Sequence, residues 1–105
     1  MKKVAVITGG ARRIGRAIAS HLHSLGFDIA LHYRSSFDSA QTLREEFCSA
    51  RPDSCHLFQA DLEDLSQVDA LASELLAHYR ALDLLVNNAS SFFLFSRCGV
   101  HTSVI

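Results

Sequence analysis

The sequence lacks several features by which whole classes of protein are recognised. It contains no tryptophan and a single proline among 105 residues, and no apolar run reaches the ~18 residues that a membrane-spanning helix needs. Met1-Lys2-Lys3 leads directly into an apolar run without a small-residue cleavage site, so we expect no signal peptide. The three cysteines form an odd, loosely spaced set, which favours a reducing, cytoplasmic compartment over a disulfide framework.

A strong net charge is missing as well. Ten basic and eleven acidic residues leave a net charge of −1, so we expect neither nucleic acid nor a membrane surface as a partner. The charges are unevenly distributed, because residues 1–34 hold six basic side chains against one acidic, and residues 35–93 hold three against ten. This asymmetry indicates an anion-binding site near the N-terminal end. The hydrophobic content of 49% argues for a folded domain, and the length allows one.

Short apolar runs alternate with helical patterns along the chain. The expected strands cover residues 4–7, 29–33, 55–58 and 84–86. The expected apolar stripes of the helices are Ile14, Ala17, Ile18, His21, Leu22 and Leu25, then Ala40, Leu43 and Phe47, then Val68, Leu71, Ala72, Leu75, Leu76 and Tyr79. Gly26 is placed to end the first helix, and Asp64 or Ser66 to cap the third. This β-α-β-α-β-α-β order predicts an α/β fold with a parallel sheet and helices on both faces.

A glycine-rich turn joins the first strand to the first helix at Thr8–Gly15. Gly9 permits a tight turn, and Gly15 permits close packing of the helix on the strand. Free N–H groups and the helix dipole favour a phosphate at this end. The basic side chains near it oppose that dipole unless an anionic ligand offsets them, namely Arg12, Arg13 and Arg16. Such a turn by itself is often only a tight turn, but its βαβ setting favours nucleotide binding.

The end of the second expected strand bears on the choice of cofactor. An acidic residue there would accept the ribose hydroxyls of NAD, but this sequence has none between His32 and Ser36. Arg34 can instead bind a 2′-phosphate, with Ser35 as a further donor. One such charge-assisted bond contributes about 1.5–3 kcal/mol, which is enough to prefer NADP(H) over NAD(H). The alternative is an ordinary exposed arginine in a loop.

These stretches resemble the short-chain dehydrogenase/reductase family. The turn at Thr8–Gly15 is similar to the family's Thr-Gly-x-x-x-Gly-x-Gly, with Arg13 in place of a glycine, as in the pteridine reductase branch. Residues 32–35, Asp61-Leu62 and residues 87–92 resemble further segments of that branch, and the resemblance covers residues 3–93. It implies a Rossmann-type sheet with strand order 3-2-1-4, and an NADP-binding half-domain over residues 1–93.

The resemblance also implies site residues and a substrate. The cofactor would be held by Thr8, Gly9, Arg13, Ile14, Gly15, Tyr33, Arg34, Ser35, Asp61, Leu62, Asn88, Ala89 and Ser90. Ser90 and Phe92 would contact a pterin or dihydropterin, with Phe92 stacked on its ring. A reductase of another carbonyl substrate is the alternative within the enzyme class.

The proton donor of the family's reduction has no counterpart in this sequence. The family places a Tyr and a Lys four residues apart on one helix face, whereas Tyr33 and Tyr79 are followed at that spacing by Phe37 and Asp83. We therefore nominate no catalytic residue and expect the chain to be inactive alone. The alternative from another class is a non-catalytic NADP-binding protein or a non-functional truncated product.

The C-terminal residues show neither a strand nor a helix pattern. Residues 94–105 are expected to form an irregular tail outside the family pattern, and we hypothesise a frameshift or premature stop near Leu94. The fourth strand would then be a sheet edge, and the family's tetramer is not expected to form.

A metal site is not expected. Cys48, Cys55 and His56 offer zinc-binding atoms, but their spacing is not that of a zinc motif, and a buried structural cysteine is the commoner case.

Overall fold

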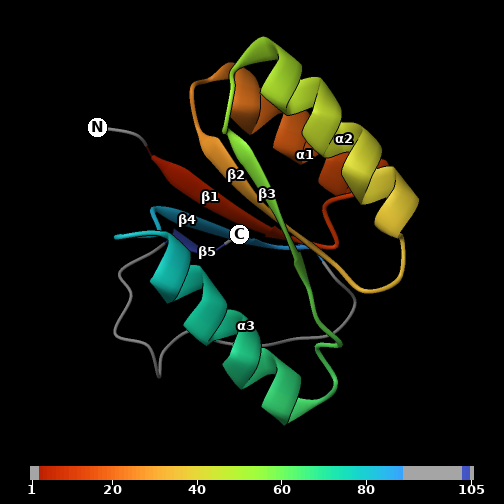
Figure 1. Cartoon of the computed structure of the whole chain (residues 1–105), viewed down its shortest axis with the longest axis vertical. Helices are drawn as coiled ribbons and strands as arrows, with labels where there is room; N and C mark the ends of the chain where they lie inside the picture. Colours follow the sequence, from red (N-terminus) through yellow and green to blue (C-terminus); the bar gives the residue numbers. More distant parts are fainter. Residues whose placement is uncertain (1–2, 89–102, 105) are drawn as a thin grey trace.

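The computed structural model describes residues 3–88 and 103–104 of the chain (Figure 1). Its elements, in chain order, are β1 (Val4–Thr8), α1 (Arg13–Ser24), β2 (Asp28–Tyr33), α2 (Phe37–Ala50), β3 (Cys55–Gln59), α3 (Leu65–His78), β4 (Leu84–Asn87) and β5 (Ser103–Val104). Among these described residues, no helix is both long enough and apolar enough to cross a bilayer.

The strands form one parallel sheet in the order β3-β2-β1-β4-β5. The predicted α/β class and the order 3-2-1-4 are therefore confirmed. The expectation that β4 forms the sheet edge is wrong at its first two residues, because Leu84 pairs with Ser103 and Leu85 pairs with Val104. The division of the chain at residue 93 stays a prediction, since residues 89–102 lie outside the described part.

The sheet is covered on both faces, which explains its continuous apolar strands. All five residues of β1 are buried. On one face α1 and α2 pack against alternate strand residues such as Ile7 and Leu31, and on the other α3 packs against Val6 and Ala30 (Figure 1). This three-layer arrangement exposes the carboxyl ends of β1, β2 and β4 along one edge.

The apolar patterns predict the buried faces of α2 and α3 well. All three predicted residues of α2 are buried, and the buried residues of α3 are Leu71, Ala72 and Leu75. Only Leu76 of the predicted α3 stripe is exposed. Asp64 is the N-cap of α3, because its side chain accepts a hydrogen bond from the Ser66 N–H at 3.0 Å.

The predicted face of α1 is wrong. Four of the six residues of its apolar stripe are exposed, among them Ile14 (69%) and Leu25 (62%). The buried residues are Gly15, Ala19 and His23. Small residues face the sheet because α1 lies close to the loop that follows β1. Of the bulkier apolar side chains, Ile18 and Leu22 are partly buried against the core, and Ile14 is exposed.

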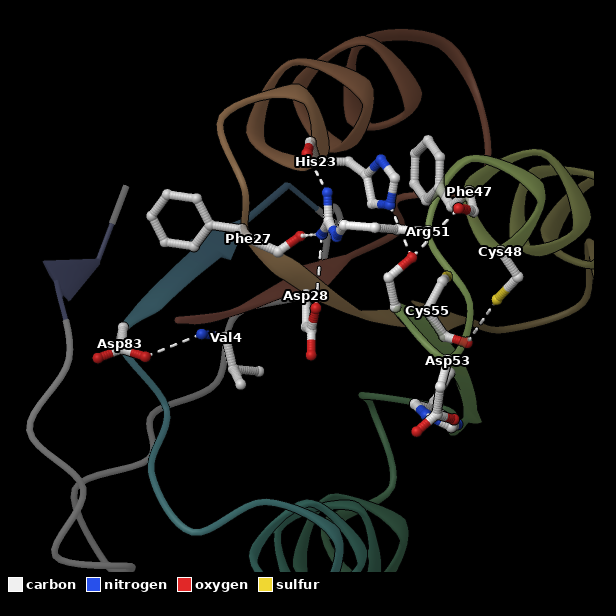
Figure 2. A network of polar contacts seen from close by, with 12 residues as sticks. Val4, His23, Phe27, Asp28, Phe47, Cys48, Arg51, Asp53, Cys55 and Asp83 are labelled. Carbon is white, nitrogen blue, oxygen red and sulfur yellow. Dashed lines mark hydrogen bonds and ion pairs between the residues drawn. The ribbon is translucent and has the colours of Figure 1, made fainter. Parts of the chain in front are cut away.

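A polar network ties the elements together at the opposite end of the sheet (Figure 2). The Arg51 guanidinium donates to the backbone oxygens of His23 at 2.9 Å and Phe27 at 2.6 Å, and lies 3.4 Å from an Asp28 carboxylate oxygen. The His23 oxygen also accepts from the Gly26 N–H at 3.0 Å, so Arg51 is a second partner there and ties the C-terminal end of α1 to the start of β2. Gly26, with a φ of 100°, completes that helix end as predicted.

Candidate functional site

Two adjoining cavities lie where β1, β2 and β4 end. The larger, of about 410 Å³, is lined by Gly9, Arg12, Arg13, Ile14 and Asn88. The smaller, of about 150 Å³, is lined by Gly9, Ala11, Arg12, Tyr33, Arg34, Ser35 and Ser36. Because Gly9 and Arg12 line both, the cavities form one basic, concave region at the N-terminus of α1.

The glycine turn has the geometry that the sequence predicts. Gly9 has a φ of 61°, a conformation that side chains disfavour. A Cβ added at Gly15 would lie 2.5 Å from the Gly9 carbonyl oxygen and 2.6 Å from Asn88 Nδ2. The close approach of α1 to the turn therefore depends on glycine at position 15.

Arg13 has a φ of 53°, which is unusual for a residue with a side chain. Such a conformation costs roughly 1–2 kcal/mol. It is the same position at which the short-chain family pattern has glycine, so the backbone keeps the glycine-like conformation while the side chain adds positive charge to the larger cavity.

Thr8 and Asn88 join the ends of β1 and β4 beside the cavities. The Asn88 N–H donates to Thr8 Oγ1 at 3.0 Å, and Asn88 Nδ2 donates to the Gly9 carbonyl at 3.2 Å. The Thr8 hydroxyl donates in turn to Asn87 Oδ1 at 3.2 Å. Both predicted residues therefore contribute to the site by fixing the path of the turn.

His32 is a part of the site to which the sequence assigned no role. Its Nδ1 accepts from the Gly9 N–H at 3.0 Å, and its Nε2 lies 2.8 Å from the Ala60 carbonyl oxygen. The side chain is 2% exposed, and this burial lowers the pKa of His32 below its usual value, although the bond to Ala60 acts in the opposite direction. The signal in the sequence is a histidine inside an otherwise apolar strand.

Arg34 borders the smaller cavity and is not isolated there. Its guanidinium lies 3.6 Å from an Asp61 carboxylate oxygen and is 64% exposed. Its carbonyl oxygen accepts from Gln59 Nε2 at 2.9 Å. Arg34 can thus turn toward an anion in the cavity while Asp61 offsets its charge in the absence of one.

The residues expected around adenine occupy different environments. The Asp61 N–H donates to Gln67 Oε1 at 2.8 Å, and one Asp61 carboxylate oxygen accepts from the Glu63 N–H at 3.0 Å. These bonds hold the loop after β3 in place. Leu62 is 6% exposed, and its side chain packs in the core on the α3 face.

Arg16 does not line either cavity. Arg16 points to α2 and pairs with Glu46 at 3.1 Å on the surface. Ala89, Ser90 and Phe92 lie outside the described residues.

The cysteine and histidine atoms considered for zinc are used otherwise. Cys48 Sγ lies 3.7 Å from the Cys55 carbonyl oxygen, and burial raises the pKa of the Cys55 thiol to about 12. His56 Nε2 lies 3.0 Å from Asp53. Within residues 3–88 and 103–104, no three acidic, His or Cys side chains are grouped so that they could hold a metal ion.

The site fits the phosphates of a dinucleotide. The turn offers backbone N–H groups at a helix N-terminus, the absence of Cβ atoms at Gly9 and Gly15 leaves the backbone close to the larger cavity, and Arg12 lies between the two cavities. Arg34 and Ser35 supply donors at the smaller cavity.

Known proteins share this sequence pattern. Pteridine reductase 1 of Leishmania tarentolae is 36% identical over 107 aligned residues, which cover 86% of this chain and 37% of that protein. The 3-oxoacyl-(acyl-carrier-protein) reductase FabG of Staphylococcus aureus is 38% identical over 89 residues, 85% of this chain and 36% of the reductase. Elsinochrome reductase 1 of Elsinoe fawcettii is 39% identical over 87 residues, 83% of this chain and 32% of that protein.

The chain thus spans about a third of the length of these curated relatives. The family profile described as short chain dehydrogenase matches residues 3–100, beyond the range 3–93 expected from the motifs. The parallel sheet, the glycine turn and this match agree, and the chain belongs to the short chain dehydrogenase family of oxidoreductases.

Proposed function

We propose that this chain provides the NADP(H)-binding part of a reductase that acts on a pterin or dihydropterin. The observation that carries the cofactor is the position of Arg34, which borders the smaller cavity together with Arg12 and Ser35. The cavity receives no acidic side chain at the end of β2, where NAD-binding proteins place one. A doubly charged 2′-phosphate suits these donors better than a ribose hydroxyl does.

Each part of the cofactor has residues that would hold it. The pyrophosphate would lie at the turn around Gly9, Arg13 and Gly15, with Thr8 and Ile14 beside it, and the 2′-phosphate at Arg34 and Ser35, beside Tyr33. Asp61 and Leu62 would lie on the adenine side, and Asn88 and Ala89 along the ribose. Ser90 would bond the pterin or a cofactor phosphate. When the cofactor is bound, its nicotinamide ring supplies a hydride. The residues of this chain would orient the cofactor and neutralise the charge of its phosphates.

The pterin is supported by sequence features in which this chain resembles one branch of the family. Arg13 replaces a family glycine, and Ser90, Ser91 and Phe92 follow the Asn-Asn-Ala segment. Pteridine reductase 1 is among the similar proteins. The alternative substrate is another carbonyl compound, because a 3-oxoacyl reductase is similar to a comparable degree.

The free thiols of Cys48 and Cys55 suit the reducing environment of the cytoplasm, which we propose as the compartment.

Catalysis by the chain alone is not part of the proposal. Neither Tyr33 nor Tyr79 has the lysine partner four residues on, so we expect cofactor binding without turnover. Mixing the purified chain with NADPH and dihydrobiopterin, dihydrofolate or a 3-oxoacyl thioester tests this. NADPH oxidation at any appreciable rate would show that an acid other than a Tyr-Lys pair is present.

Cofactor choice is tested by titrating NADPH and NADH against the chain and following nicotinamide fluorescence. NADPH should bind about 10- to 100-fold more tightly, since one charge-assisted bond is worth about 1.5–3 kcal/mol. The Arg34→Asp variant should reverse this preference, because its carboxylate repels the phosphate and accepts from the ribose hydroxyls.

The matched control is Arg16→Asp. Arg16 is an equally charged residue in the first turn of α1, but it pairs with Glu46 and lines neither cavity. It should leave the ratio of the two dissociation constants unchanged. A preference that survives in Arg34→Asp, or that is lost equally in Arg16→Asp, would contradict the role given to Arg34.

A further inference from the structure

We propose that His32 is a positioning residue for the cofactor, a neutral imidazole that joins the phosphate turn at Gly9 to the loop after β3 at Ala60. The inference rests on the proposed cofactor site. In this role, His32 would not contact the cofactor itself. It would act by fixing the two loops between which the cofactor would lie.

Each ring nitrogen of His32 has one backbone partner, and the two partners belong to different loops. Nδ1 accepts from the Gly9 N–H at 3.0 Å, and Nε2 lies 2.8 Å from the Ala60 carbonyl oxygen. Gly9 lines both cavities, and Ala60 immediately precedes Asp61, the ion-pair partner of Arg34. One side chain therefore links the phosphate turn to the segment that carries Asp61. It adds to two backbone bonds that tie these loops to β2, from the Gly10 N–H to the His32 oxygen and from the Ala60 N–H to the Tyr33 oxygen, each at 3.2 Å.

These contacts determine the protonation of the ring. A carbonyl oxygen can only accept, so Nε2 must carry the hydrogen, and Nδ1 must offer a lone pair to the Gly9 N–H. A doubly protonated ring would direct an N–H at another N–H and would lose the bond to Gly9. The link is therefore available only to the neutral Nε2–H tautomer.

The surroundings of His32 keep it neutral. It lies in register with Phe58 of β3, and its side chain is 2% exposed. The charged groups near its partners are Arg34 and Asp61, which pair with each other at 3.6 Å, and Arg12 on the cavity side. On α3, Gln67 is an uncharged amide bonded to the Asp61 N–H at 2.8 Å. Burial lowers the pKa of His32, in agreement with this environment.

Both backbone polar groups of Gly9, its N–H and its carbonyl oxygen, have hydrogen-bond partners. Its N–H is held by His32, and its carbonyl oxygen accepts from Asn88 Nδ2 at 3.2 Å. The residue has a φ of 61°, so its backbone is free to rotate when either bond is lost. We expect the loss of the histidine to loosen the turn before a ligand arrives, which weakens binding by adding an ordering cost.

The first test uses the unsubstituted 105-residue chain without cofactor. Nitrogen-15 NMR of the histidine rings should show one ring as the Nε2–H tautomer with a hydrogen-bonded Nδ1, and scalar coupling should connect that Nδ1 to the Gly9 N–H. A ring in the Nδ1–H form, or a Gly9 amide that exchanges with solvent as fast as an open loop, would overturn the proposal.

The second test compares three variants by NADPH titration and thermal melting. His32→Phe keeps a flat aromatic ring but removes both bonds, and should weaken NADPH binding by about 10-fold, the value of one hydrogen bond of about 1.4 kcal/mol. His32→Asn keeps a compact acceptor for the Gly9 N–H and should recover most of the affinity. Equal binding by His32→Phe and the unsubstituted chain would overturn the proposal.

His23→Phe is the matched control. His23 is also a buried histidine, 7% exposed, but it bonds to Ser54 at 2.7 Å at the opposite end of the sheet. It should lower the melting temperature without changing the dissociation constant of NADPH. If both Phe variants weaken binding equally, His32 has only a structural role.

The pH dependence of binding separates this proposal from the proposed function. In the unsubstituted chain, NADPH affinity should fall as the pH drops and His32 takes a proton. In the His32→Asn chain, the remaining change of NADPH affinity with pH comes from protonation of the cofactor's own phosphate. Its affinity should therefore fall less steeply as the pH drops. Parallel profiles would overturn the role of His32 while leaving the cofactor site intact, whereas an unsubstituted chain that binds neither NADPH nor NADH would refute the proposed function itself.

Discussion

Gly15 is the residue on which the approach of α1 to the phosphate turn depends. In Gly15→Ala the new Cβ would meet the Gly9 carbonyl oxygen at 2.5 Å and Asn88 Nδ2 at 2.6 Å, so backbone must shift. We expect a loss of about 1–3 kcal/mol in the free energy of unfolding, measured by urea denaturation. Nicotinamide cofactor binding should weaken as well, because the shift occurs at the turn.

Gly26→Ala is the control for this substitution. Gly26 lies beyond the other end of α1, with a φ of 100° and no atom within 4 Å of an added Cβ. Its substitution should cost about 1–2 kcal/mol through backbone strain alone and leave cofactor binding unchanged. Unaltered binding in Gly15→Ala would show that the turn does not depend on this close contact.

The buried histidines make stability depend on pH. The pKa of His23 is lowered by burial and then by Arg51, with Asp28 acting in the opposite direction, and the pKa of His32 is lowered by burial. Between these lowered values and the unfolded value of about 6.5, the unfolded chain binds more protons than the folded chain. The free energy of unfolding should therefore fall as the pH is lowered below about 6.5, and stay level above it.

Urea denaturation at several pH values measures this effect. Each of the two histidines adds a slope of at most about 1.4 kcal/mol per pH unit. His23→Gln removes one titrating group and should reduce the slope in that range. An acid slope that is the same in His23→Gln as in the unsubstituted chain would contradict the assignment.

At the scale of the elements, the sequence patterns predicted the strands and two of the three helix faces. The apolar spacing works for α2 and α3 because their cores are built from large side chains such as Leu43 and Leu71. It fails for most of α1 because the centre of its contact face holds the smallest residues, Gly15 and Ala19, four positions apart, while Ile18 and Leu22 are only partly buried. A pattern based on hydrophobicity gives such residues little weight.

The buried face of α1 is tested by two equal substitutions on opposite sides of the helix. Ala19 is 0% exposed, so Ala19→Leu adds three carbons to a filled space and should destabilise the protein by about 1–3 kcal/mol. Ala17 is exposed, so Ala17→Leu should change stability by less than about 0.5 kcal/mol. Urea denaturation distinguishes the two, and the reverse order would restore the face expected from the apolar stripe.

The sequence predicted those parts of the candidate site whose residues lie close together in the chain. The glycine turn and the position of Arg34 could be predicted because each depends on only a few consecutive residues. The role of His32 could not be predicted, because it depends on Ala60, 28 residues further on in another loop. The same holds for the pairing of Arg34 with Asp61, which only the adjacency of β2 and β3 creates.

At the scale of the whole molecule, Arg51 joins three elements at the end of the sheet away from the cavities. Arg51→Met keeps the apolar stem but removes donors to the backbone oxygens of His23 and Phe27. We expect a loss of about 1.5–3 kcal/mol, seen as a melting temperature lower by several degrees in calorimetry. Cofactor binding should be unaffected because of the distance along the sheet.

Arg80→Met provides the comparison for this variant. Arg80 is exposed after the end of α3, so its loss should shift the melting temperature by little. Equal shifts in the two variants would show that the contacts of Arg51 add no net stability.

The order of the strands has a consequence for when the site is formed during synthesis. The central strand, β1, leaves the ribosome first, but the contacts that close its far side arrive late, since the bonds from Thr8 to Asn87 and from Asn88 to Gly9 each span 79 residues. The segment β1-α1-β2 can assemble early from neighbours in the sequence, whereas the glycine turn receives its last partner only after Asn88 has been made. A nascent chain should therefore gain affinity for the nicotinamide cofactor late and in one step, when β4 docks beside β1.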